Sequence, residues 1–260
     1  MAEKISAAAV AERLNRCECG MLTLCFDEID STNSEAKRQI INGNRQPMLL
    51  IAEAQTAGHG RMGRSFFSPA GTGVYMSLKL PGEQVKNRLM TISAAVAVSL
   101  AVEELSGKSV SVKWVNDILI GERKIAGILA EAIHETRSDY VIGIGINVTT
   151  EEFPPALQGQ AGAICADLSR EDLIVDVITR LMGFLRKEDT EEILREYRVR
   201  SMLLGQEITY YKNGKMQRAD ALAVTDDGAL LVRDENGVEE LLIAGEVSLH
   251  KYEQGRADTV

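Results

Sequence analysis

The residues with the clearest chemical potential form a glycine- and arginine-rich segment at positions 58–65, with the sequence GHGRMGRS. Glycine lets backbone N–H groups approach an anion closely, and each arginine offers a planar fork of donors to paired oxygen atoms. The apolar run at 48–52 precedes this segment and the alternating run at 74–80 follows it, so it connects two predicted strands. The composition predicts a phosphate-binding loop, and a glycine-rich hairpin with incidental arginines is the alternative.

Two well-known phosphate-binding patterns fit the same segment only in part. It matches G-x-G-x-x-G, and it nearly matches G-x-x-x-x-G-K-[ST], with Arg64 in the lysine place. Both patterns require a helix to follow, whereas residues 66–73 lead into the predicted strand at 74–80. This context argues against a dinucleotide fingerprint and against a P-loop.

Composition narrows the possible partners. The net charge of -9 argues against non-specific binding of nucleic acid, which depends on basic surface patches. No apolar run approaches the roughly 20 residues that span a bilayer, and Met1-Ala2-Glu3-Lys4 lacks the features of a signal peptide, so a cytoplasmic protein is expected. The four cysteines include no C-x-x-C pair and the three histidines lie far apart, which indicates neither a zinc site nor a disulfide framework.

Apolar periodicity and capping residues predict the elements that must position these groups. Helices are expected at 5–14, 31–41, 84–105, 171–186 and 191–200, the second capped by Asp30 or Ser31. Strands are expected at 22–26, 48–52, 74–80, 109–114, 124–132 and 140–148, with 118–123 as a tight connection. From residue 205 to 250, short alternating strands are separated by Asn213-Gly214, Asp226-Asp227-Gly228 and Asn236-Gly237, which are hairpin signals. The sequence therefore predicts an α+β domain followed by a small antiparallel β barrel.

Several motifs fall at the ends of predicted strands in one order. They are STN at 31–33, Gln55 before the glycine-arginine segment, KWVND at 113–117, RKIAGIL at 123–129, GIGIN at 143–147 and GEVSL at 245–249. Together they resemble the biotin protein ligases (biotin to acetyl-CoA-carboxylase ligases), and the resemblance covers nearly the whole chain. It implies a central mixed β-sheet with flanking helices at 1–203 and an SH3-like β barrel at 204–260.

The resemblance implies a two-step reaction. Biotin and ATP form biotinyl-5′-AMP and pyrophosphate, and a lysine of a biotin carboxyl carrier protein domain then takes the biotinyl group. No side chain need act as nucleophile, but cations must stabilise the pentacovalent phosphorus, and Lys124, Arg61 and Arg64 are the candidates, with Mg²⁺ sharing the work.

Residue roles follow from the resemblance position by position. The residues expected at biotin are Ser31, Thr32, Asn33, Gln55, His59, Gly60, Arg61, Lys124, Gly127 and Gly143. Those expected at ATP or the adenylate are Arg61, Arg64, Phe66, Asn116, Asp117, Lys124 and Asn147, with Asn116 and Asp117 also near the metal ion. Hydroxyls and amides suit the ureido ring of biotin, which offers one acceptor and two N–H donors. Trp114 is expected in the core or in a pocket wall.

The sequence departs from the family pattern in places. Val115 stands where proline is usual, and His59 replaces a commoner arginine. The 30 residues before Ser31 are too few for a winged helix beside the predicted helix and strand, so a monofunctional ligase without DNA binding is expected. A lipoate or octanoate ligase of the same superfold and a non-catalytic biotin sensor remain alternatives. An exposed strand of the sheet could pair with the carrier domain or with a second copy in a homodimer.

Overall fold

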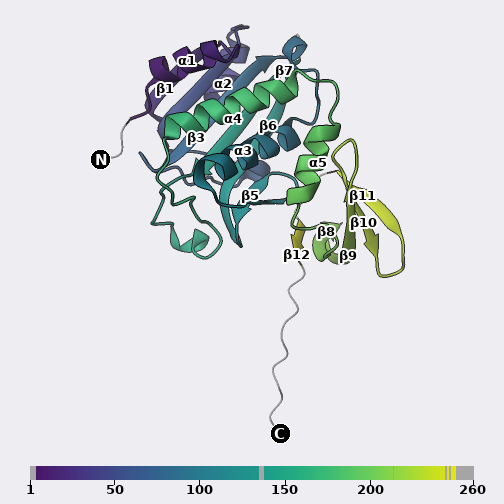
Figure 1. Cartoon of the computed structure of the whole chain (residues 1–260). Coiled ribbons are helices and arrows are strands. Elements are labelled where there is room, and N and C mark those ends of the chain that lie inside the picture. The colour runs from purple at the N-terminus through teal and green to yellow at the C-terminus, as the bar shows by residue number, and fades with distance from the viewer. Residues whose placement is uncertain (1–3, 135–137, 213, 244, 246, 250–260) are drawn as a thin grey trace.

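A mixed seven-stranded β-sheet is the centre of the molecule (Figure 1). The computed structural model describes residues 4–134, 138–212, 214–243, 245 and 247–249. The strand order is β1-β2-β3-β7-β6-β5-β4; β1 and β2 are parallel and the other neighbours are antiparallel. The strands are β1 (Leu22–Ile29), β2 (Met48–Gln55), β3 (Gly73–Pro81), β4 (Ser111–Lys113), β5 (Asp117–Ile120), β6 (Arg123–His134) and β7 (Ser138–Asn147). This sheet confirms the predicted α+β class.

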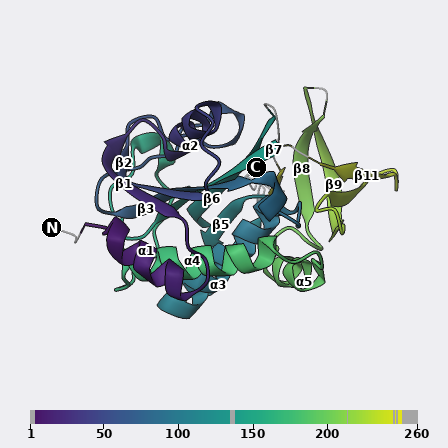
Figure 2. The ribbon, with the colours of Figure 1, turned by 90° about the horizontal axis from the view of Figure 1, so that it is seen from above.

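The helices cover the two faces of this sheet unequally, as Figure 2 shows. The α-helices are α1 (Ala7–Arg16), α2 (Thr32–Ile41), α3 (Met90–Ser106), α4 (Arg170–Leu185) and α5 (Glu191–Arg200), and the short 3₁₀ turns are η1 (Arg61–Gly63), η2 (Gly82–Gln84) and η3 (Pro155–Leu157). Helices α1, α3 and α4 bury the larger core on one face. On the other face α2 packs Ala36 and Ile40 against Met48, Leu50 and Val141. The rest of that face is left for a cavity. Within the described residues, no helix is long and apolar enough to cross a membrane.

Local sequence signals predicted the start of α2 correctly but not the start of α3. Ser31 caps α2, accepting a hydrogen bond from Ser34 N, as its side chain predicts. Periodicity predicted that this helix begins at residue 84, but α3 begins at Met90. The backbone N–H groups of Lys86 and Asn87 instead donate to the carbonyl of Leu185 at the end of α4. This tertiary contact holds the segment before α3 outside the helix.

One predicted connection is itself a strand. Residues 118–120 were expected to join two strands, but they lie in β5, which pairs with β4 on one side and β6 on the other. Ile118 is fully buried. Pairing with β4 and β6 and the burial of Ile118 therefore stabilise a strand that the short apolar run alone did not predict.

The strands after residue 205 form a second, five-stranded antiparallel sheet in the order β11-β10-β9-β8-β12. Its strands are β8 (Glu207–Lys212), β9 (Lys215–Val224), β10 (Leu230–Asp234), β11 (Glu239–Leu242) and β12 (Val247–Leu249). Turns lie at the predicted hairpin positions, although Asn213, Glu246 and residues 250–260 fall outside the described residues. Trp114 Nε1 donates to Gly228 O at 3.1 Å, which attaches the β9–β10 turn to the larger domain. Closure into an SH3-like barrel and the boundary at 203/204 stay predictions.

Candidate active site

A cavity of about 620 Å³ opens on the sheet face that α2 leaves uncovered. Gly127 of β6 and Gly145 of β7 face each other in register, and Gly143 lies two residues away on β7. Because these positions lack side chains, the strands provide a low floor. The predicted site residues that line the cavity are Ser31, Thr32, Asn33, Gln55, His59, Gly60, Arg61, Arg64, Phe66, Asn116, Asp117, Lys124, Gly127 and Gly143.

Two of these glycines make room for specific side chains. A Cβ atom on Gly143 would lie 2.1 Å from Asn33 Oδ1, and one on Gly145 would lie 2.5 Å from the ring of Phe66. Both distances are impossible for real atoms, so Asn33 and Phe66 rest directly on the strands. The rings of Tyr75 and Phe66 pack in a T-shaped pair, and Tyr75 donates its hydroxyl to Pro69 O at 3.0 Å. Burial raises the pKa of Tyr75 to about 12. The ring of Phe66 is therefore well supported.

One end of the cavity is polar and uncharged. Gln55 Oε1 accepts from Thr32 N at 2.8 Å and from Thr32 Oγ1 at 3.2 Å, while Gln55 Nε2 donates to Ser68 Oγ at 3.0 Å. Ser68 in turn donates to Phe66 O. These contacts fix the orientation of the Gln55 amide and join the start of α2 to the residues after the glycine-arginine segment.

Behind this end lies a residue that the sequence reasoning missed. Ser77 of β3 is fully buried, with its Oγ 2.7 Å from Thr32 Oγ1 and 2.5 Å from Asn33 Oδ1. Its signal in the sequence is a hydroxyl within an otherwise apolar strand, because a buried polar group needs partners. A second missed residue, Glu131 of β6, accepts from Asn33 Nδ2 at 3.0 Å.

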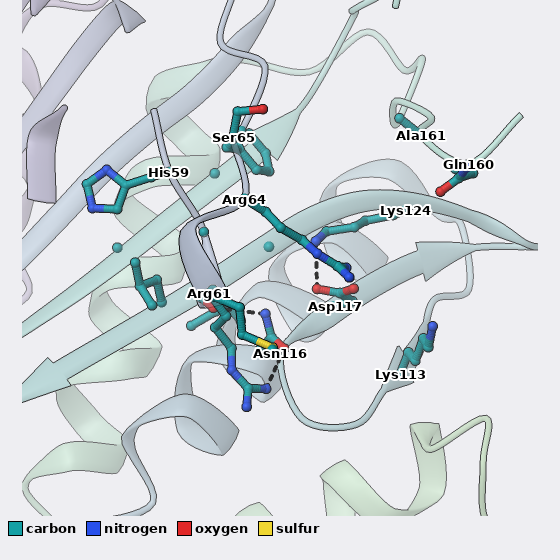
Figure 3. Close-up of a pocket in the computed structure, with 18 of the residues that line it drawn as sticks. His59, Arg61, Arg64, Ser65, Lys113, Asn116, Asp117, Lys124, Gln160 and Ala161 are labelled. Carbon is teal, nitrogen blue, oxygen red and sulfur yellow. Dashed lines mark hydrogen bonds and ion pairs between the residues drawn. The ribbon is translucent and has the colours of Figure 1, made fainter. Parts of the chain in front are cut away.

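The cationic groups of the cavity are held by polar partners (Figure 3). Lys124 Nζ forms an ion pair with Asp117 Oδ1 at 2.7 Å, and Arg61 donates to Asn116 Oδ1 at 3.1 Å. Asn116 Nδ2 donates to Ile128 O at 3.1 Å. Figure 3 shows Arg64 extending from the loop toward Lys124 and Asp117. Arginine, lysine and carboxylate groups thus meet where a polyanion could bind.

The glycine-arginine segment folds into a small hairpin over the cavity. Gly60 N donates to Arg64 O at 2.7 Å, and Phe66 N donates to Gly58 O at 2.8 Å. At the tip, Met62 and Gly63 have φ angles of 57° and 73°. Glycine adopts such angles readily, whereas methionine does so at a cost. The strand-to-strand context predicted from the sequence is therefore correct.

Segments distant in the sequence complete the walls. The additional lining residues include Lys113, Trp114, Leu157, Gly159, Gln160, Ala161, Gly245, Val247, Ser248 and Leu249. The backbone of Lys124 receives the segment after η3: Lys124 N donates to Gln160 O at 2.8 Å, and Lys124 O accepts from Gly162 N at 2.9 Å. Trp114 was expected in the core or in a pocket wall. The segment after η3 was not predicted to reach the site, because pairing with an irregular segment leaves no periodic signal.

Asn147 is the one predicted site residue that does not line the cavity. It is 5% exposed, and its Nδ2 donates to Gly162 O at 2.9 Å. Asn147 therefore supports the segment beside Lys124, while its Oδ1 has no hydrogen-bond partner among the described residues. The expected contact with adenine stays a prediction.

Among the described residues, the cavity offers few protein ligands for a metal ion. The described residues contain no group of three or more histidine, cysteine, aspartate or glutamate side chains suited to a metal ion. Asp117 offers a carboxylate inside the cavity, while both polar atoms of the Asn116 amide already bond within the protein. One carboxylate suffices for Mg²⁺ when substrate phosphates and water supply the other ligands.

Comparison with known proteins gives consistent similarities. The Biotin/lipoate A/B protein ligase family model matches residues 25–147, and the Biotin protein ligase C terminal domain model matches residues 203–250. The bifunctional ligase/repressor BirA of Bacillus subtilis is 29% identical, over 93% of this chain and 78% of that protein. The biotin–[acetyl-CoA-carboxylase] ligase of Mycobacterium tuberculosis is 28% identical, over 84% of this chain and 85% of that one. A structure of Aquifex aeolicus biotin protein ligase in complex with biotin and ATP superposes with a TM-score of 0.76 at 26% identity, covering 88% of this chain and 99% of that chain.

Proposed function

The chain belongs to the biotin protein ligase family, and from this we propose that its cavity activates biotin with ATP and biotinylates a lysine of a carrier domain. One observation carries the proposal. Uncharged hydrogen-bonding groups at the start of α2 and the cationic groups Arg61, Arg64 and Lys124 share one cavity with a glycine floor. The first set suits a ureido ring, and the second suits a carboxylate and phosphates.

The ureido ring of biotin is assigned to the polar residues Ser31, Thr32, Asn33 and Gln55. The hydroxyl of Ser31 accepts from Ser34 N and keeps its own proton for an acceptor such as the ureido carbonyl. Gly127 and Gly143 line the cavity floor and let Lys124 and Asn33 lie close to the strands, with His59 and Gly60 contributing loop backbone above it. The ring of Phe66 is assigned to stack on the adenine of the adenylate.

In the first step a carboxylate oxygen of biotin attacks the α-phosphorus of ATP. A new O–P bond forms, and the bond to the bridging oxygen breaks, releasing pyrophosphate. Lys124 and Arg64 line the cavity, and we assign to them the stabilisation of the negative charge that builds on the phosphoryl oxygens. Asp117 is the residue that would hold Mg²⁺, which when bound neutralises phosphate charge.

In the second step the amine of a carrier lysine attacks the acyl carbon of biotinyl-5′-AMP. An amide bond forms, the acyl C–O bond breaks, AMP leaves, and the amine loses a proton to solvent. The acceptor is assigned as a biotin carboxyl carrier protein domain of a carboxylase, and the reaction is that of a biotin–[biotin carboxyl-carrier protein] ligase. Lys124 and Arg61 hold the acyl phosphate during this transfer.

Pyrophosphate release tests the substrate assignment. With ATP and Mg²⁺, biotin is expected to release pyrophosphate, whereas lipoate and octanoate are expected to release little, because an alkyl or dithiolane tail leaves the polar groups at α2 without partners. Faster release with lipoate or octanoate would identify a ligase for those acids. Biotin binding with no release would identify a sensor.

Gly143→Ala is expected to raise the KM for biotin about tenfold or more, as loss of a good hydrogen bond or a clash in the site would do. The added methyl group would displace Asn33, whose Oδ1 lies 2.1 Å from the Cβ position. Gly183→Ala in α4 is the matched control, because its Cβ would meet nothing within 4 Å. Steady-state pyrophosphate release measures both variants, and an equal KM in the two would contradict the assigned place of Asn33.

A further inference from the structure

Glu131 makes a contact that sets the orientation of a cavity residue. Its Oε2 accepts from Asn33 Nδ2 at 3.0 Å, and its Oε1 pairs with Lys37 Nζ at 2.7 Å. Neither Glu131 nor Lys37 lines the cavity, whereas Asn33 does. An ionised carboxylate can only accept hydrogen bonds, so the side of the Asn33 amide that faces Glu131 must be its NH₂ group.

The neighbour on the other side of Asn33 cannot set this orientation. Ser77 Oγ lies 2.5 Å from Asn33 Oδ1, and a hydroxyl can either donate or accept. If the amide turned over, Ser77 could accept from the NH₂ group at no great cost. Glu131 would then face an oxygen, with two acceptors in contact and no proton between them. Glu131 is therefore the group that prevents the flip.

We propose that Glu131 is a positioning residue for biotin recognition: it holds Asn33 so that Oδ1 accepts from a ureido N–H. This rests on the proposed function, since it takes biotin as the substrate. Asn33 is 5% exposed, and its Oδ1 lies over Gly143 on the cavity floor. The fixed oxygen adds an acceptor for a ligand that presents N–H donors, and it disfavours ligands that present only acceptors or alkyl groups there. Lys37 holds the carboxylate from the outer side, where its side chain is 30% exposed.

The decisive variants are Glu131→Ala and Glu131→Gln. Glu131→Ala frees the Asn33 amide to turn and is expected to raise the KM for biotin about tenfold, with kcat for adenylation within about twofold, because the charged groups at the phosphates are untouched. Glu131→Gln can direct its amide oxygen at Asn33 and its NH₂ group outward, displacing Lys37 into solvent, so it should restore most of the affinity. Lys37→Met is the matched control, since it removes only the outer partner.

Two further measurements separate positioning from general support of the fold. In an Asn33→Ala background, Glu131→Ala should raise KM no further, because the two residues act through one contact. Wild type should prefer biotin over a biotin methylated at a ureido nitrogen, and Glu131→Ala should narrow that preference. An unchanged KM in Glu131→Ala, an additive effect in the double variant, or a loss in Glu131→Gln as large as in Glu131→Ala would each overturn the proposal.

The result for wild type distinguishes failure of the proposed function from failure of the proposed role of Glu131. If wild type releases pyrophosphate with biotin and Glu131→Ala matches it in KM, the positioning role alone fails. If wild type does not use biotin, the proposed function fails and the role of Glu131 fails with it. Thermal unfolding of each variant shows whether a lower activity reflects a smaller folded fraction. If Glu131→Ala is unstable, its preference for biotin over the methylated biotin remains informative, because a ratio measured in one preparation does not depend on the folded fraction.

Discussion

Lys124→Gln is expected to slow the formation of biotinyl-5′-AMP by about 10²-fold or more, the usual effect of removing one preorganised electrostatic contact. Glutamine keeps much of the length of lysine but removes the charge. It also removes the ammonium that lies 2.7 Å from Asp117 Oδ1, so the negative charge of Asp117 opposes the incoming phosphates more strongly. Like charges in a partly enclosed site repel, so the loss should exceed that of a single hydrogen bond. Single-turnover adenylation followed by rapid quench measures the rate.

Biotin binding should change less than the chemical step in this variant, because the phosphoryl charge develops only as the reaction proceeds. Equilibrium titration with biotin alone checks this. Lys86→Gln is the matched control: it removes one positive charge from the surface, where Lys86 is exposed and its Nζ lies 3.8 Å from Glu188. Adenylation at the wild-type rate in Lys124→Gln, or an equal loss in Lys86→Gln, would remove Lys124 from the chemistry.

The sequence predicted those features that depend on short-range signals. Ser31 is a strong capping residue, and it begins α2 as expected. The glycines at 58–63 and the strands around them predicted a connecting loop with arginines over a binding site, and Arg61 and Arg64 line the cavity. Apolar runs and alternation of apolar residues predicted the strands of both sheets except β5, because a strand with one buried face repeats every two residues.

Features that depend on contacts between distant segments could not be read in the same way. Lys124 and Asp117 lie in one predicted region, but their ion pair requires β5 to exist as a strand beside β6, and residues 118–120 are too short a run to predict it. Ser77 and Glu131 lie on β3 and β6, and each contacts Asn33 of α2 across more than forty residues of sequence. A polar residue within a strand pattern predicts a need for partners but not their identity.

Asn147 is a motif residue that also supports a neighbouring segment. It ends β7 as the motif predicted, yet its amide bonds to Gly162 and supports the segment that pairs with Lys124. This segment carries Gln160 and Ala161 into the wall. Its Oδ1 has no hydrogen-bond partner among the described residues, and the expected contact with adenine stays a prediction.

The glycine-arginine loop has few groups that can hold it closed. Its backbone hairpin is short, and Met62 at its tip is 76% exposed. Ordering several residues costs roughly 1 kcal/mol or more each, so side-chain anchors must offset that cost. The contact of Arg61 with Asn116 is one such anchor, and the adenylate would give the same guanidinium an anion to bind. The closed loop would then shield the mixed anhydride from water.

Arg61→Gly is therefore expected to form some biotinyl-5′-AMP but to release it about 10- to 100-fold faster, the equivalent of a lost charge-assisted hydrogen bond of about 1.5–3 kcal/mol. Released adenylate would label lysines of bystander proteins in solution. Met62→Gly is the matched control, because it adds a glycine to the same loop, at a φ of 57° that glycine accepts, and leaves the guanidinium in place. Rapid-mixing measurement of adenylate dissociation, with labelling of a non-cognate protein, compares the two variants. Retention at the wild-type level in Arg61→Gly would show that another group holds the loop, and equal release from both variants would assign the effect to backbone flexibility.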